Sequence, residues 1–203
     1  MRIGIFGGTF DPPHIGHISA CKAFLDCVEL DVLYIIPVYM PPHKNISSDT
    51  DERDRLEMSR RAFEPLSDKI FVSDLEIKRG GRSYTADTIK QIKSENENAE
   101  IFFLCGTDMI LTMDYWYKPE YIFANATIVY ARRESETDVT EKIAEKCKLY
   151  REKFGARIIY TENNAIEASS TEIREAILKD KNDSRLLSKA VSDYIKEKKL
   201  YKS

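Results

Sequence analysis

The sequence predicts an α/β fold in which a doubly wound parallel sheet carries helices on both faces. Short apolar runs recur along the 203-residue chain without polar alternation, which is typical of strands that are buried on both sides. Segments of helical length and mixed charge separate these runs, so strands and helices alternate. No repeat, linker or shift in composition interrupts the chain. We therefore expect one domain over residues 1–203, with the C-terminal helices from about residue 170 packed on it.

The individual elements follow from local composition. Runs rich in β-branched and aromatic residues predict six strands: Arg2–Phe6, Asp31–Val38, Ile70–Ile77, Ile101–Cys105, Thr127–Ala131 and Arg157–Thr161. Charged, amphipathic stretches predict the helices: Gly16–Val28, Asp51–Phe63, Tyr84–Ser94, one starting within Asp108–Asp114, Thr137–Phe154, Ser170–Lys179 and Arg185–Leu200. Ligands of open parallel sheets bind at the carboxyl ends of the strands, so the loops that follow the strands are the expected site.

Composition excludes several classes of protein. Lys and Arg total 31 and Asp and Glu total 34, giving a net charge of −3 and no basic footprint for nucleic acid. The chain contains no apolar window of about 18 residues and no secretory signal, so we expect a cytoplasmic protein without membrane contact. The four cysteines form no C-x-x-C pair, which predicts reduced, mostly buried thiols rather than a zinc site or disulfides.

The loop after the first strand has the features of a phosphate cradle. Gly7 and Gly8 lack side chains, so their backbone N–H groups can approach an anion closely. The next helix points its positive end at this loop, and His14 and His17 share one face of its first turn. The loop matches neither the Walker A pattern nor the G-x-G-x-x-G dinucleotide fingerprint. A plain glycine turn is the second interpretation and a histidine metal pair is the third.

Other loops add candidate anion-binding groups. Ser169-Ser170-Thr171-Glu172 matches a capping box, and Arg174 follows in the first turns of that helix. Lys44 stands beside His43, the only other histidine, in a proline-stiffened loop after the second strand. Taken singly, these are an ordinary cap and a surface lysine. The single tryptophan, Trp116, suits either stacking on a planar base or core packing.

Two motifs resemble a known superfamily. GGTFDPPHIGH, residues 7–17, resembles the signature of nucleotidyltransferases with the (H/T)-x-G-H motif, and SSTEIR, residues 169–174, resembles their second motif. PPHK at 41–44, SYTADT at 83–88 and GTD at 106–108 are similar to motifs of bacterial nicotinate-mononucleotide adenylyltransferases. The similarity covers nearly the whole chain. Ala168 stands where isoleucine is usual, and the Pro-Gly that commonly follows the arginine near 133 is missing.

The resemblance implies a Rossmann-like fold and adenylyl transfer from ATP to nicotinate mononucleotide, giving deamido-NAD and pyrophosphate in NAD biosynthesis. It implies a catalytic set of His14, His17, Lys44 and Arg174. It implies ATP contacts at Gly8, Thr9, Phe10, Ser169, Ser170 and Thr171. It implies mononucleotide contacts at Thr85, Gly106, Asp108, Trp116, Tyr117 and Arg133. Mg²⁺ would accompany ATP without a named protein ligand, and a homo-oligomer is left open.

Two alternatives stand beside this interpretation. Phosphopantetheine adenylyltransferases share the two outer motifs, but their chains are shorter and lack the SYTADT segment. A non-catalytic nucleotide-binding protein on the same fold predicts loss of the histidines, Lys44 or Arg174, and all of these residues are present.

Overall fold

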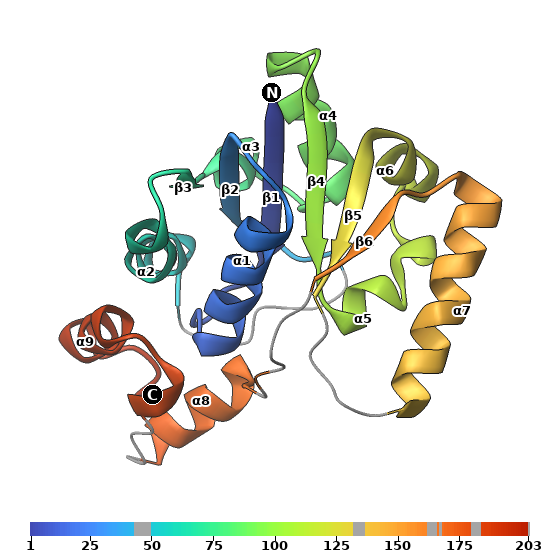
Figure 1. Ribbon diagram of the computed structural model, residues 1–203. Coiled ribbons are helices and arrows are strands. Elements are labelled where there is room, and N and C mark those ends of the chain that lie inside the picture. The colour runs from blue at the N-terminus through green and yellow to red at the C-terminus, as the bar shows by residue number, and fades with distance from the viewer. Residues whose placement is uncertain (43–49, 132–136, 162–165, 167, 180–183, 203) are drawn as a thin grey trace.

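The computed structural model describes residues 1–42, 50–131, 137–161, 166, 168–179 and 184–202. Within them, six strands form one sheet: β1 (Arg2–Gly8), β2 (Val32–Pro37), β3 (Ile70–Val72), β4 (Glu100–Cys105), β5 (Ala126–Tyr130) and β6 (Ile158–Tyr160). The strand order is β3-β2-β1-β4-β5-β6 and every neighbouring pair is parallel (Figure 1). The predicted doubly wound parallel sheet is confirmed. Its topological switch point lies between β1 and β4, where the chain reverses direction across the sheet.

Helices cover both faces of this sheet. They are α1 (Ile15–Cys27), α2 (Glu52–Phe63), α3 (Leu75–Arg79), α4 (Thr85–Glu95), α5 (Thr107–Ile110), α6 (Pro119–Asn125), α7 (Thr137–Phe154), α8 (Ser170–Leu178) and α9 (Lys189–Lys198). One buried cluster joins the sheet to α4, α5, α6 and α7, and a second joins it to α1, α2, α8 and α9. Phe103 of β4 lies in the first cluster and its neighbour Phe102 lies in the second. This period of two explains why the strands are apolar throughout.

The third strand is shorter than predicted. It ends at Val72, whereas the sequence predicted a strand as far as Ile77. The chain turns instead into α3, whose helical bonds run from Lys78 N to Asp74 O and from Gly80 N to Glu76 O. Gly80 ends this helix with a φ of +68°, a conformation that glycine adopts without strain. The consequence is that Glu76 is buried in the interior rather than carried along an edge strand.

The C-terminal region also differs from the prediction. The expected helix over Arg185–Leu200 is interrupted, because Ser188 accepts a hydrogen bond from Val191 N and starts α9 at the next residue. The short helix α6 was not predicted; it begins with Pro119 at its first position. In Figure 1, α8 and α9 lie near α1 and α2, beyond the carboxyl ends of the strands. The assignment of all helices to a single domain stays a prediction.

Most of the cysteines are buried, as predicted. All four are free, with Cys21, Cys105 and Cys147 buried and Cys27 exposed. Among the described residues, none of the helices combines the length and the apolar character needed to cross a bilayer.

Candidate functional site

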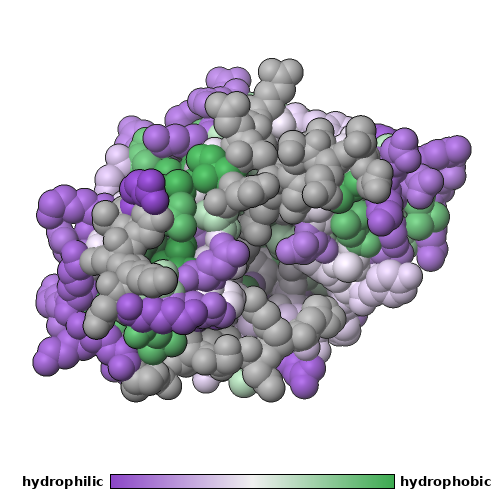
Figure 2. Space-filling model, turned by 90° about the horizontal axis from the view of Figure 1, so that it is seen from below, coloured by the Kyte–Doolittle hydropathy of each residue, from purple (hydrophilic) through white to green (hydrophobic). Residues whose placement is uncertain are grey.

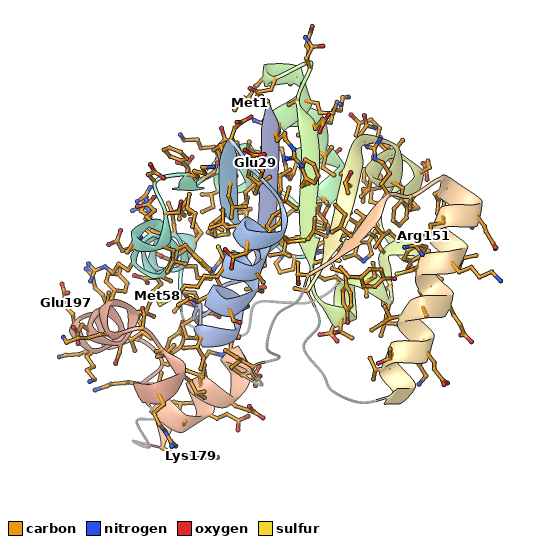
Figure 3. The ribbon with its side chains drawn as sticks, in the orientation of Figure 1. Met1, Glu29, Met58, Arg151, Lys179 and Glu197 are labelled. Atoms are coloured by element: carbon orange, nitrogen blue, oxygen red, sulfur yellow. The ribbon has the colours of Figure 1, made fainter. Side chains whose placement is uncertain are left out.

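A cavity of about 690 Å³ opens at the carboxyl edge of the sheet. Figure 2 looks onto the molecule from below, and this face is hollowed near its centre. Met1 and Glu29 mark the opposite edge of the sheet (Figure 3). The lining includes every predicted site residue that the structure describes: Gly8, Thr9, Phe10, His14, His17, Thr85, Gly106, Asp108, Trp116, Tyr117, Ser169, Ser170, Thr171 and Arg174. Lys44 and Arg133 lie outside the described residues.

The loop after β1 is shaped by one close contact. A Cβ on Gly8 would lie 2.8 Å from the ring of Phe10, so no larger residue fits there without displacing that ring. Phe10 is itself 1% exposed and has a φ of +50°, which is strained for an aromatic residue. Its ring packs edge-on against Phe6 and Phe63 at centroid distances of 5.3 and 5.2 Å. This aromatic cluster fixes the loop beneath the cavity.

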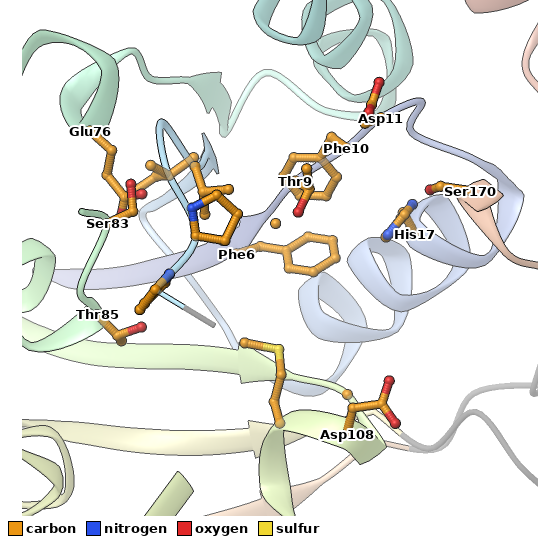
Figure 4. A pocket seen from close by; sticks show the side chains of 18 of the residues that line it. Phe6, Thr9, Phe10, Asp11, His17, Glu76, Ser83, Thr85, Asp108 and Ser170 are labelled. Atoms are coloured by element: carbon orange, nitrogen blue, oxygen red, sulfur yellow. The ribbon is translucent and has the colours of Figure 1, made fainter. Parts of the chain in front are cut away.

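The two histidines at the start of α1 lie together, as the spacing predicted. Their rings stack with centroids 3.7 Å apart. The backbone N–H of His14 donates to Nδ1 of His17 at 3.2 Å, so Nδ1 of His17 carries no proton and the ring N–H is at Nε2. Both histidines line the cavity; His14 is the more buried of the two, and His17 lies beside Ser170 in Figure 4. His17 is therefore placed to donate a hydrogen bond to a bound anion.

The helix α8 begins where the sequence predicted, but the predicted capping box does not form. Ser169 occupies the N-cap position, and within the described part of the chain its side chain makes no capping bond. The hydroxyl of Ser170 donates instead to the carbonyl of Pro12 at 2.9 Å. This bond ties the start of α8 to the loop after β1. It places the positive end of the α8 dipole at the cavity.

Arg174 joins the same two segments. Nη1 of Arg174 donates to the backbone carbonyl of Asp11 at 2.7 Å, and Nη2 donates to the hydroxyl of Thr171 at 3.2 Å. These bonds use two of the five N–H donors of a guanidinium. Because Arg174 also lines the cavity, its remaining donors are available to a ligand there.

The other end of the cavity is aromatic and is closed by α4. Thr85 is the first residue of α4, whose backbone N–H groups at this end suit a carboxylate or phosphate. The rings of Tyr84 and Tyr117 lie 4.6 Å apart. Trp116 packs edge-on against Phe103, with centroids 6.2 Å apart, and also lines the cavity. The two roles open to Trp116, core packing and contact with a planar ligand, are thus compatible.

The end of β4 lies between these two ends of the cavity. Gly106 is the N-cap of α5, and Asp108 follows in its first turn with an exposed side chain. Figure 4 shows Asp108 on one side of the space, His17 and Ser170 at a second, and Thr85 at a third. A ligand that spans both ends therefore passes Gly106 and Asp108.

Sequence reasoning missed Arg55 of α2. This side chain is 1% exposed and donates to the carbonyls of Val38 at 2.6 Å and Thr9 at 3.1 Å. It therefore cross-links the loops that follow β1 and β2, which both border the cavity. The sequence did contain a signal for its burial, because Arg55 lies on the same helical face as the apolar residues Met58 and Ala62.

Glu76 was also missed. It is 5% exposed, lines the cavity, and accepts a hydrogen bond from the hydroxyl of Thr88 at 2.5 Å. Arg79 lies 3.7 Å from the same carboxylate oxygen. Burial raises the pKa of Glu76 above its ordinary value, and hydrogen bonds from Thr88 and Ser83, with the charge of Arg79, oppose this only in part. Glu76 was missed because the sequence predicted a strand as far as Ile77, whereas the residue lies in the helix α3.

Substituting Glu76 with Gln should make stability less dependent on pH. A carboxyl group with a raised folded-state pKa contributes stability below its unfolded pKa and loses it as pH rises through the folded value. The free energy of unfolding of Glu76→Gln, relative to the wild type, should therefore increase between about pH 4 and pH 7. Urea denaturation at several pH values measures this, with the exposed Glu97→Gln as control. A relative decrease over the same interval would contradict the assignment.

The described residues also bear on a metal. No group of three or more His, Cys, Asp or Glu side chains in the described ranges could hold a metal ion. The third interpretation of the histidine pair, a metal site, therefore gains no further ligand from this part of the chain.

Comparison with known proteins places the chain in a family. The cytidylyltransferase-like family model matches residues 5–176. Proteins named probable nicotinate-nucleotide adenylyltransferase are similar over their full length. The one from Halalkalibacterium halodurans is 33% identical, covering 100% of this chain and 92% of the relative. The one from Bacillus pumilus is 35% identical, covering 100% and 99%.

Solved structures agree in fold. The Plasmodium falciparum nicotinic acid mononucleotide adenylyltransferase complexed with APC has a TM-score of 0.74 at 19% identity, covering 98% of this chain and 96% of that one. A putative nicotinate-nucleotide adenylyltransferase from Vibrio parahaemolyticus has a TM-score of 0.67 at 22% identity, covering 100% and 96%. At these identities the likeness concerns the fold alone. With the family model spanning most of the chain and relatives above 30% identity spanning all of it, the chain belongs to the cytidylyltransferase-like family of nucleotidyltransferases.

Proposed function

We propose that this protein transfers the adenylyl group of ATP to nicotinate mononucleotide, giving deamido-NAD and pyrophosphate. One observation carries the proposal: a single cavity joins an end suited to phosphates, with His17, Arg174 and the start of α8, to an aromatic end at the start of α4. The names of the full-length relatives support the choice of substrates. A phosphopantetheine adenylyltransferase or a non-catalytic nucleotide-binding protein has no such support among these relatives.

The chemistry needs little from the protein beyond placement and charge. A phosphate oxygen of the mononucleotide attacks the α-phosphorus of ATP, the new P–O bond forms, and the bond to the β-phosphate bridging oxygen breaks. The attacking oxygen is already anionic, so no general base removes a proton. The barrier falls because the two nucleotides are held in line and because donors stabilise the charge on the transferring group and on pyrophosphate.

The phosphate end supplies those donors. The N–H at Nε2 of His17 donates to the α-phosphate, and His14 supports the same ring by stacking. Arg174 and the N-terminal turn of α8, with Ser169, Ser170 and Thr171, receive the β- and γ-phosphates that leave together. Gly8, Thr9 and Phe10 contact the nucleotides through the backbone. Lys44, outside the described residues, is proposed to bind the same triphosphate.

The aromatic end receives the mononucleotide. Thr85 and the backbone beside Tyr117 donate to the pyridine carboxylate, and Trp116 contacts the ring. Gly106 and Asp108 lie between the two ends and contact ribose. Arg133, also outside the described residues, is proposed for the mononucleotide site.

Magnesium fits this site as a companion of ATP. Mg²⁺ retains several waters and commonly binds through substrate phosphates rather than through a cage of protein ligands. The two aspartates at the cavity are compatible with that mode. The carboxylate of Asp11 already accepts hydrogen bonds from two hydroxyl groups, and the side chain of Asp108 is exposed. The ion would neutralise part of the phosphate charge, and we name no protein ligand for it. We also propose a cytoplasmic location, which the four free thiols support.

Pyrophosphate release tests the proposed function. The protein should release pyrophosphate when ATP and nicotinate mononucleotide are both present, and the dinucleotide product should appear in equal amount. Nicotinamide mononucleotide and phosphopantetheine, tested side by side with the same ATP, should react more slowly. Equal or faster reaction with phosphopantetheine would contradict the choice of acceptor. Release with no acceptor present would contradict adenylyl transfer.

A further inference from the structure

The last described residues of the chain return to the loop after β1. Beyond α9, Lys199 and Tyr201 both have left-handed backbone, with φ of 56° and 61°. A bulky residue adopts this conformation only when its surroundings hold it there. Tyr201 is 5% exposed, and its hydroxyl lies 3.9 Å from the sulfur of Met58, which Figure 3 labels between α2 and α9. The side chain of Tyr201 is thus directed into the protein interior.

The hydroxyl of Tyr201 has a specific partner. It donates to Oδ1 of Asp11 at 2.6 Å, across 190 positions of sequence, and the hydroxyl of Thr50 donates to the same oxygen at 2.6 Å. Burial and the Asp11 carboxylate both raise the pKa of Tyr201, so the hydroxyl keeps its proton and remains a donor. Hydrogen bonds of this length to an ionised acceptor belong to the strong class. Asp11, 4% exposed, is therefore held in one orientation.

Asp11 in turn holds Arg174. Its backbone carbonyl accepts the 2.7 Å bond from Nη1 of Arg174, and its Oδ2 lies 4.0 Å from the same nitrogen. Asp11 and Arg174 line the cavity, whereas Tyr201 reaches it only through its bond to Asp11. Figure 4 shows Asp11 at the end of the cavity where His17 and Ser170 also lie. A continuous series of contacts thus runs from Tyr201 through Asp11 to the guanidinium of Arg174 at the site.

We propose that Tyr201 is a positioning residue for the phosphate end of the cavity, acting through Asp11 on Arg174. This inference rests on the proposed function, in which Arg174 binds the phosphates that leave as pyrophosphate. A free arginine side chain populates many rotamers, and ordering it opposes binding. With Asp11 fixed by Tyr201, the guanidinium is ordered before ATP arrives, and its alignment with the reacting phosphates improves.

A matched control lies nearby. The hydroxyl of Tyr194 donates to Oδ1 of Asp54 at 2.9 Å, and Tyr194 is 6% exposed. Tyr201→Phe and Tyr194→Phe each remove one bond from a buried tyrosine to a carboxylate. Both should lower the melting temperature. Only Tyr201→Phe should lower kcat/KM for ATP, by about tenfold, with the KM for nicotinate mononucleotide unchanged.

A double-mutant cycle tests whether the effect passes through Arg174. In an Arg174→Ala background, Tyr201→Phe should change kcat/KM for ATP by less than about twofold. A tenfold loss that persists there would overturn the inference, as would equal kinetics for the two Phe variants. Should Tyr201→Phe fail to fold, Thr50→Val removes a second donor to Asp11 Oδ1. It should lower the same constant, and an unchanged constant would overturn the inference.

The experiments distinguish a failure of this inference from a failure of the proposed function. If the wild type releases no pyrophosphate from ATP and nicotinate mononucleotide, the proposed function fails. If the wild type is active and Arg174→Ala is impaired while Tyr201→Phe is not, only the positioning role fails.

Discussion

Replacing His17 with Gln should lower kcat/KM for pyrophosphate release by about 100- to 1000-fold while the protein stays folded. The loss follows because His17 supplies a rigidly held ring N–H at Nε2 toward the proposed α-phosphate, whereas the amide N–H of glutamine is carried on a flexible side chain that must be ordered to reach the same place. Stability is retained because glutamine at the third position of a helix can still accept the N–H of the N-cap residue, as Nδ1 of His17 does from His14. Steady-state kinetics and thermal unfolding measure the two quantities on the same sample.

Two further variants sharpen this comparison. His17→Ala removes both the donor and the cap acceptor, so it should show the same kinetic loss and a lower unfolding free energy, by about 1 kcal/mol. Lys22→Ala, at an exposed position of the same helix, should keep wild-type kinetics. Full turnover in both His17 variants would show that the imidazole does not stabilise the transferring phosphate.

Replacing Arg55 with Ala should destabilise the fold by about 3–5 kcal/mol, the range for breaking a buried charged interaction. The variant leaves the carbonyls of Val38 and Thr9 without their guanidinium donor in the protein interior. Burial lowers the pKa of Arg55, and the Asp11 carboxylate opposes this. Arginine stays protonated in proteins, so the variant also removes a positive charge next to the phosphate end of the site. Urea unfolding measures the loss as a fall in the denaturation midpoint.

The same helix offers the control for Arg55. Arg53 is exposed on α2, and Arg53→Ala should change the free energy of unfolding by no more than about 0.5 kcal/mol. Arg55→Lys should be intermediate, because one ammonium group cannot match the forked geometry that reaches both carbonyls. Equal midpoints for Arg55→Ala and Arg53→Ala would mean that the buried guanidinium does not hold the two loops together.

Much of the site could be predicted because its motifs are local in sequence. His14 and His17 are three residues apart, so their shared helical face follows from the period of a helix. The loops after β1 and β4 could be brought together from the rule that ligands bind at the carboxyl ends of parallel strands. The short strand β3 and the break before α9 were predicted wrongly. There, strand-like composition was outweighed by the helical hydrogen bonds of α3, and helix-forming composition was outweighed by the Ser188 cap.

The sequence by itself determined the alternation of six strands with helices and the motif residues that line the cavity. These depend on hydrophobic periodicity and on motifs within about a dozen residues. Only the tertiary structure decided the roles of Arg55, Glu76 and Tyr201. The partners of Arg55 are carbonyls of other elements, and Tyr201 meets Asp11 across almost the entire chain. Burial of a charge is tolerated only where such partners converge, and no local pattern records which distant groups will meet.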